Sequence, residues 1–246
     1  MRRDEAWLDG GTLGARRVIA HGHYGRPFLA FPTDMGAATD FEERGMLDSV
    51  GRLVEGGRAK IYCLDSFDRS SWRNPELSLE QRARAHLAFE AFVVDQVVPL
   101  IHRDCGGPQD VGVLGFSFGA FHAANFCLRR ADLFPLSLCF SGVYDVSVVG
   151  GGWERGDTAY FNNPMDYMRN AEGDHLDWLR RRCRLLLVCG QGAFEDSTGA
   201  LQSTRDFAAL LQAKGLPCEL DLWGWDVPHD WPSWGAQLAH HLPRFC

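Results

Sequence analysis

Apolar residues along this chain fall into short runs that alternate with longer stretches of mixed apolar and charged residues. Several runs in the second half, such as 111–116 and 185–189, are almost continuously apolar. Runs of this length and composition are typical of strands that are buried on both faces of a parallel sheet. The pattern predicts strands at 17–21, 28–31, 59–64, 111–116, 136–140, 185–189 and 218–223.

The stretches between these runs have the spacing of amphipathic helices. Segment 79–103 is the clearest, because its apolar residues form a broad stripe among charged ones. Helices are predicted at 42–55, 79–103, 118–130, 201–214 and 231–242. Alternating strands and helices predict an α/β fold, with a mostly parallel central sheet and helices on both faces. Neither a repeat nor a low-complexity linker divides the sequence, so we expect residues 1–246 to form a single domain.

One segment, 144–182, breaks the alternation. It contains no convincing strand, the glycine run 150–152 predicts a loop, and Asn163-Pro164 can start a short helix. The segment is longer than an ordinary connection. We therefore expect an excursion over the top of the sheet, and the sequence leaves open whether it is a mobile lid.

Composition and charge exclude several classes of protein. Of the 246 residues, 46% are hydrophobic and 23% charged, which is ordinary for a globular domain and excludes disorder, collagen and coiled coil. The net charge of −7 disfavours a nucleic-acid partner, because phosphate contacts need a basic surface. No apolar run approaches the ~18 residues of a membrane-spanning helix.

Cysteine and histidine usage bears on location and metals. The eight cysteines are scattered without a C-x-x-C pair, and no apolar stretch follows the basic start of the chain. Both features predict reduced thiols and a cytoplasmic protein. His21-Gly22-His23 places two imidazoles close together but lacks a third ligand nearby, so we expect no metal site and no cofactor.

The sequence 115–119 reads Gly-Phe-Ser-Phe-Gly, a G-x-S-x-G pattern. An apolar strand leads into it and a helix rich in small residues leads out, which is the context of a nucleophile elbow. The sharp turn requires small neighbours, which Gly115 and Gly119 supply. Ser117 would then stand at a helix N-terminus, where backbone N–H groups favour a developing oxyanion. The alternative interpretation is a glycine-rich turn without chemistry.

A serine hydroxyl needs a base to become a nucleophile. Of the nine histidines, five follow Ser117, and His229 alone lies in a loop directly after the last predicted strand. That loop is where this architecture places its base. The other four lie too near the serine, in the interrupting segment or on the last helix: His122, His175, His240 and His241.

The acid is expected after the strand at 185–189, where Glu195 and Asp196 are adjacent. Asp196 is preferred because it is nearer the next helix, and Glu195 is the alternative; either carboxylate could orient the imidazole.

The oxyanion hole is expected to use the N–H of Phe118 and one N–H from the loop after the strand at 28–31. Met35 is the favoured second donor and Asp34 the alternative.

Three segments carry a resemblance to a known family: 115–124, which holds the elbow, 140–145, which reads Phe-Ser-Gly-Val-Tyr-Asp, and 229–231, which reads His-Asp-Trp. The chain resembles α/β-hydrolases of the esterase branch that includes esterase D, feruloyl esterases, enterochelin esterases and mycolyltransferases. One departure is the acid, which the branch places about three residues after the glycine that ends the strand. Here the carboxylates come five and six residues after Gly190.

The resemblance implies hydrolysis of a small-molecule carboxylic ester by a Ser-His-Asp/Glu triad through an acyl-enzyme, without a cofactor. Two alternatives remain open: an acyltransferase with the same triad, and a catalytically silent scaffold used for binding. A homo-oligomer is compatible with the sequence.

Overall fold

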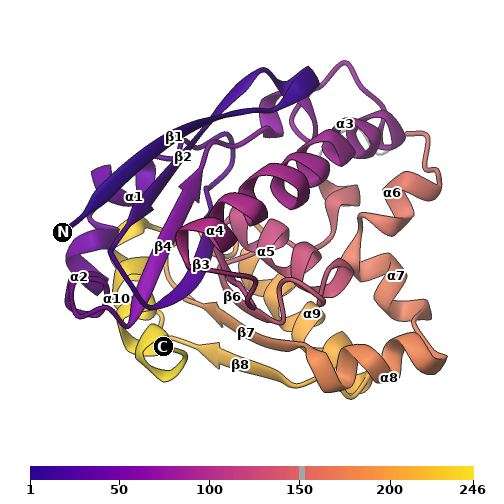
Figure 1. Cartoon of the computed structure of the whole chain (residues 1–246). Coiled ribbons are helices and arrows are strands. Elements are labelled where there is room, and N and C mark those ends of the chain that lie inside the picture. Colours follow the sequence, from indigo (N-terminus) through magenta and orange to yellow (C-terminus); the bar gives the residue numbers. More distant parts are fainter. Residues whose placement is uncertain (150–152) are drawn as a thin grey trace.

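The computed structural model describes residues 1–149 and 153–246, so the predicted loop at 150–152 lies outside the described residues. The described strands form one eight-stranded sheet (Figure 1), in the order β1-β2-β4-β3-β5-β6-β7-β8. Their bounds are β1 (Arg3–Asp9), β2 (Ala15–His21), β3 (Arg26–Phe31), β4 (Ala59–Leu64), β5 (Gly112–Phe116), β6 (Leu136–Phe140), β7 (Arg184–Cys189) and β8 (Cys218–Leu222).

The sheet is mostly parallel, as predicted. Strands β3 to β8 run in the same direction along the order β4-β3-β5-β6-β7-β8, whereas β1 and β2 join antiparallel at one edge. All seven predicted strands are confirmed, but β1 was missed. Its sequence is largely charged and most of its side chains are exposed. A polar edge strand lacks the apolar run that reveals a buried one.

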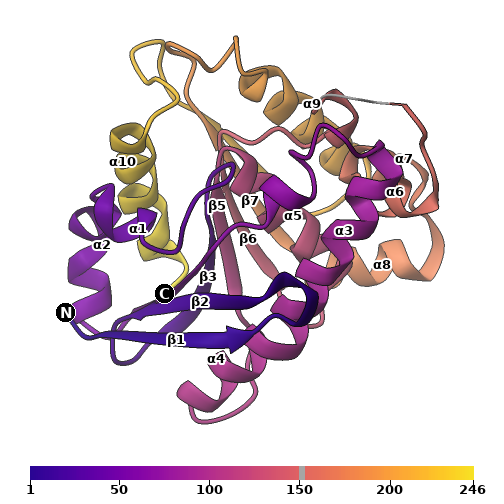
Figure 2. The ribbon, with the colours of Figure 1, turned by 90° about the horizontal axis from the view of Figure 1, so that it is seen from above.

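Helices cover both faces of the sheet (Figure 2), with α1, α2 and α10 on one side and α3, α4, α5 and α8 on the other. Each side has its own apolar core. Val50 of α2 and Leu238 of α10 pack on the strands on the first side, and Phe92 of α3 and Phe126 of α5 pack on them on the second side. The helices are α1 (Asp40–Glu43), α2 (Met46–Glu55), α3 (Leu79–Phe92), α4 (Val98–Asp104), α5 (Phe118–Arg129), α6 (Asp157–Phe161), α7 (Pro164–Asn170), α8 (Gly173–Arg182), α9 (Ala200–Ala213) and α10 (Trp231–His241).

Two predicted helices are interrupted. The helix expected at 42–55 is divided into α1 and α2 by Gly45, whose φ of 77° ends one helix and starts the next. The helix expected at 79–103 contains a π-helical turn, Val93–Val97, between α3 and α4. Pro99 follows this turn and has no N–H to donate. A π turn is a common local adjustment in such a helix.

The segment 144–182 is largely helical in its described part, and only its beginning lies beside the elbow. Val146, Val149 and Ala159 pack in a small cluster with Phe118 and Trp72. Further along, α7 and α8 place their apolar residues in the larger core, on the face of the sheet that α3 and α5 cover. Asn163 and Pro164 start α7, as predicted.

All eight cysteines are free thiols, five of them buried. No helix in the described ranges has both the length and the apolar composition needed to cross a membrane.

Candidate active site

Ser117 lies between β5 and α5 in the turn that the G-x-S-x-G pattern predicts. Its backbone has a φ of 54° and a ψ of −122°, a strained conformation for a residue with a side chain. A Cβ on Gly115 would lie 2.0 Å from the carbonyl oxygen of Gly119. A Cβ on Gly119 would lie 2.3 Å from the carbonyl oxygen of Pro32. Both glycines are therefore required by close backbone contacts. The contact at Gly115 lies within the elbow, and the contact at Gly119 places the elbow against the end of β3 and the loop that follows it.

His229 is positioned by a pairing of two loops, residues 190–199 after β7 and residues 223–230 after β8. Three backbone hydrogen bonds join them: Gln191 N to Gly224 O (3.2 Å), Gly192 N to Val227 O (2.9 Å) and His229 N to Ala193 O (3.0 Å). The close approach needs glycine, since a Cβ on Gly190 would lie 2.1 Å from the oxygen of Val227. This pairing brings the predicted base and the predicted acid loop together.

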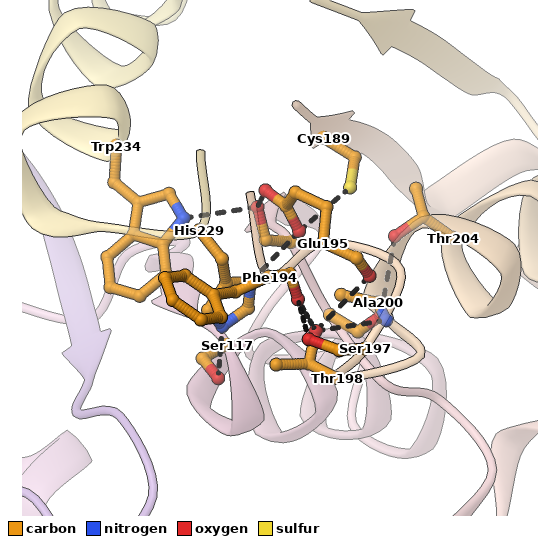
Figure 3. Close-up of polar contacts among 12 residues, drawn as sticks. Ser117, Cys189, Phe194, Glu195, Ser197, Thr198, Ala200, Thr204, His229 and Trp234 are labelled. Carbon is orange, nitrogen blue, oxygen red and sulfur yellow. Dashed lines mark hydrogen bonds and ion pairs between the residues drawn. The ribbon is translucent and has the colours of Figure 1, made fainter. Parts of the chain in front are cut away.

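Ser117, His229 and Glu195 form a continuous hydrogen-bonded chain (Figure 3). The Oγ of Ser117 is 3.0 Å from Nε2 of His229, and Nδ1 of His229 is 2.9 Å from Oε2 of Glu195. A carboxylate can only accept at Nδ1, so the network assigns the imidazole proton to Nδ1 and leaves Nε2 free to accept from the serine. This is the arrangement that general-base activation of a hydroxyl requires.

Asp196, the preferred candidate for the acid, does not reach the imidazole. Glu195 is fully buried, whereas Asp196 is exposed to solvent, so the preference for Asp196 was wrong as to which carboxylate contacts His229. The cause is the turn that precedes them. Phe194 has a φ of 70°, and the N–H of Glu195 bonds back to Gly192, which directs the first carboxylate inward and the second outward.

Glu195 has further buried partners besides the imidazole. The hydroxyl of Ser141 donates to its Oε1 at 2.6 Å, and the thiol of Cys189 donates to its Oε2 at 3.4 Å. Burial raises the pKa of the Cys189 thiol, which keeps it a donor. The indole of Trp234 donates to the Oγ of Ser141 at 3.1 Å and lies edge-on to His229, with ring centroids 4.9 Å apart.

Ser141 and Trp234 are thus site residues whose roles the sequence did not indicate. Ser141 directly follows β6 and has a φ of 51°, close to the φ of Ser117 after β5. The only local sign was its place in the Ser-Gly-x-x-Asp segment. Trp234 was one of four tryptophans near His229, and it is buried, while Trp225 is 71% exposed.

The loop after β3 holds both candidates for the second oxyanion donor, Met35 and its alternative Asp34. Met35 has a φ of 53° and an exposed side chain, and its N–H has no hydrogen-bond acceptor within the described residues. The carboxylate of Asp34 pairs with Arg73 at 2.7 Å, and the Arg73 guanidinium lies 5.0 Å from the ring of Phe118. Burial raises the pKa of Asp34, although Arg73 opposes it. Arg73 therefore links the loop to the first residue of α5.

Three buried polar residues lie behind the elbow. His122, on α5, is 2.9 Å from the carboxylate of Asp68, and its ring stacks on that of His86 with centroids 5.2 Å apart. Burial holds the pKa of His86 well below that of a free imidazole. The ring of His122 also meets that of Phe118 edge-on. These groups pack against the start of α5, the helix that follows Ser117, and do not contact Ser117 through any hydrogen bond of the described residues.

The remaining histidines considered as bases have structural partners or distant positions. His241, on α10, bonds to Asp221 at 2.8 Å, and His175 packs on Trp178 in α8. Across the described residues, no group of three or more His, Cys, Asp or Glu side chains is arranged to hold a metal ion.

Solved structures of similar fold include esterases and other hydrolases. One is a ferulic acid esterase, 19% identical, with a TM-score of 0.75 over 99% of this chain and 97% of that one. Another is FphF, a fluorophosphonate-binding serine hydrolase of Staphylococcus aureus, 12% identical with a TM-score of 0.74 over 99% and 97%. A third is the S-formylglutathione hydrolase FrmB of the same organism, 14% identical with a TM-score of 0.68 over 99% and 96%. At these identities the likeness shows the α/β-hydrolase fold.

Sequence comparisons carry the assignment further. A comparison with curated proteins found no significant match. A family model does match, and it covers residues 63–245, which include the elbow, the acid loop and His229. Because this match spans well over half of its length, the chain belongs to the esterase family described as "Putative esterase".

Proposed function

We propose that the protein hydrolyses carboxylic esters of small molecules through a Ser117–His229–Glu195 triad and a covalent acyl-enzyme. The observation that carries the proposal is the unbroken chain of hydrogen bonds from the hydroxyl of Ser117 to the buried carboxylate of Glu195. The first bond orients the base toward the nucleophile, and the second stabilises the imidazolium that forms.

The reaction follows from these contacts. Nε2 of His229 takes the proton as Oγ of Ser117 attacks the ester carbonyl, and the imidazolium then protonates the leaving alkoxide. The oxyanion is stabilised by the N–H of Phe118, which as the first residue of α5 has no intrahelical acceptor. The N–H of Met35 is the second proposed donor. Water, activated by the same imidazole, cleaves the acyl-enzyme.

The test is labelling with a fluorophosphonate, read by intact mass and peptide mapping, beside hydrolysis of p-nitrophenyl esters of graded chain length. We expect one adduct, on Ser117, and loss of that adduct in His229→Ala. No adduct on folded protein would contradict the proposal and favour a silent scaffold. Product analysis with an added alcohol or thiol would reveal transfer in place of hydrolysis.

We also propose a cytoplasmic location. Its support is that the eight cysteines are free in this structure, five of them in the core. Free thiols are maintained in reducing compartments. Fractionation of the native host, with the cysteines alkylated before lysis, tests it, and extensive oxidation of the thiols in cells would contradict it.

A further inference from the structure

A cavity lies at the opposite end of the sheet from Ser117. Its volume is about 1080 Å³, and it is lined by Arg26 and Arg184, the first residues of β3 and β7, together with Lys60 of β4 and Phe245. In the parallel part of the sheet these positions mark the amino ends of the strands, whereas Ser117 follows the carboxyl end of β5. We call this cavity the amino-end pocket.

The charge of the amino-end pocket is opposite to that of the whole protein. The chain has a net charge of −7, yet the cationic lining residues outnumber the acidic ones, Asp104 and Asp110. The cationic lining residues are Arg26, Arg58, Lys60, Arg182, Arg184 and Arg244. Clustered cations on the walls of a cavity create a field that attracts anions.

Ion pairs within the protein neutralise only part of this charge. Lys60 binds Asp104 at 2.5 Å, and Arg182 pairs with Asp110. Arg244 is bonded to Glu219, which is outside the pocket lining. Both acidic residues of the lining are therefore already occupied by other cations.

Arg58 donates to the main-chain oxygens of Pro243 and Cys246. The guanidinium groups of Arg26 and Arg184 likewise have no Asp or Glu partner among the described residues. Arg26 donates to the carbonyl oxygen of Phe245 at 3.0 Å, and Arg184 lies 5.3 Å from the ring of the same phenylalanine. Arg26 is half-buried, and burial lowers its pKa because the attraction of Asp110 and Cys246 does not fully compensate the lost hydration. A half-buried cation bonded only to a carbonyl would gain from a bound anion.

We propose that the amino-end pocket binds an organic phosphate that carries at least two negative charges, through the guanidinium groups of Arg26 and Arg184. The planar guanidinium matches phosphate oxygens with two parallel hydrogen bonds. The pocket has more room than inorganic phosphate requires, and Tyr24, 74% exposed, provides an aromatic surface at its edge. A nucleoside diphosphate, with a base that can stack on Tyr24, fits this combination.

The experiment is isothermal titration of the full chain at low ionic strength with pyrophosphate, ADP and adenosine. We expect saturable one-to-one binding of pyrophosphate and ADP, tighter for ADP, weakened by added salt, and no binding of adenosine. Citrate tests whether any polyanion suffices, and citrate binding as tight as that of ADP would contradict the phosphate assignment.

The variants are Arg184→Gln and Arg26→Gln, with Arg44→Gln as the matched control. Arg184 and Arg44 are both exposed, and Arg44 is outside the pocket lining, so the two substitutions remove the same charge from different places. Arg184→Gln should weaken ADP binding roughly tenfold or more, and Arg44→Gln less than about twofold. Equal effects of the two, or no saturable binding at millimolar ADP by folded protein, would overturn the proposal. Because Arg184 is exposed, its replacement tests the pocket even where Arg26→Gln fails to fold.

Discussion

The two ends of the parallel strands differ in what they hold: the carboxyl end concentrates backbone strain and the amino end concentrates charge. Among the described residues, the non-glycine residues with positive φ are Met35, Ser117, Ser141, Glu154 and Phe194. All but Glu154 belong to the loops that follow β3, β5, β6 and β7. The amino ends of β3 and β7 carry arginines in ordinary backbone conformations.

The difference reflects two ways of building a site. Each strained residue costs about 1–3 kcal/mol and persists only where surrounding contacts enforce it. At the carboxyl end those contacts are the close backbone approaches at glycines and the hydrogen bonds to Glu195. They hold the side chains from Ser117 to Glu195 in one defined geometry. At the amino end the arginines need no special backbone, because their long side chains can adjust to an anion. A catalytic hydrogen-bond chain requires the rigid, strained loops of the carboxyl end. Binding of an anion requires only the flexible arginines of the amino end.

The substitution Ser117→Ala should have the largest effect and should separate ester hydrolysis at the carboxyl end from ligand binding at the amino end. We expect ester hydrolysis to fall by at least about 10⁴-fold, because the nucleophile is lost, while binding of ADP at the amino-end pocket stays unchanged. Turnover of a p-nitrophenyl ester and titration with ADP measure the two ends in one preparation. Full turnover in the variant would show that Ser117 is not the nucleophile.

The next largest effect distinguishes the two adjacent carboxylates. Glu195→Gln should lower kcat about 10³- to 10⁴-fold, because an amide can no longer stabilise the imidazolium or fix its tautomer. Asp196→Asn is the matched control, since its side chain is exposed, and it should change kcat less than about twofold. Steady-state kinetics on one ester decide between them, and a larger loss in Asp196→Asn would reverse the assignment.

A smaller effect is expected where strain and hydrogen bonding meet in one residue. Ser141→Ala removes the donor to Glu195 and should lower kcat about 10- to 100-fold, as loss of a supporting hydrogen bond does at other sites. Ser141→Gly removes the same hydroxyl but relieves the positive φ, so its free energy of unfolding, measured by denaturant titration, should exceed that of Ser141→Ala by about 1 kcal/mol. Equal stability of the two variants would show that the conformation is not strained.

The smallest effect concerns stability against pH behind the elbow. The folded pKa of His86 lies well below the unfolded value of about 6.5, so below that pH the unfolded chain binds the extra proton. Stability from this group is fully present above pH 6.5 and falls with decreasing pH, by at most about 1.4 kcal/mol per unit. His86→Gln should flatten the decline in the free energy of unfolding between pH 6.5 and 5. The difference at pH 8 serves as the packing control, and an unchanged slope would contradict the assignment.

Local signals in the sequence were sufficient for much of the fold and for part of the site. The buried strands are nearly continuous apolar runs, and their positions were predicted because burial on both faces disfavours polar residues. Ser117 could be located because the turn itself demands Gly115 and Gly119, as the clashes at both positions show. His229 followed from its place after the last strand, and the structure brings it to Ser117.

Only the tertiary structure decided the rest, because those features depend on residues far apart in the chain. The choice of Glu195 over Asp196 depends on a left-handed Phe194 and on contacts with Ser141, which is 54 residues away in the chain. The polar strand β1 is held by pairing with β2 and not by its own composition. The amino-end pocket draws Arg26, Arg184 and Phe245 together from three distant segments. Local sequence patterns reflect constraints on each residue by itself, such as burial or a sharp turn. Which side chains meet in one site depends on how the strands pair and how the loops contact one another.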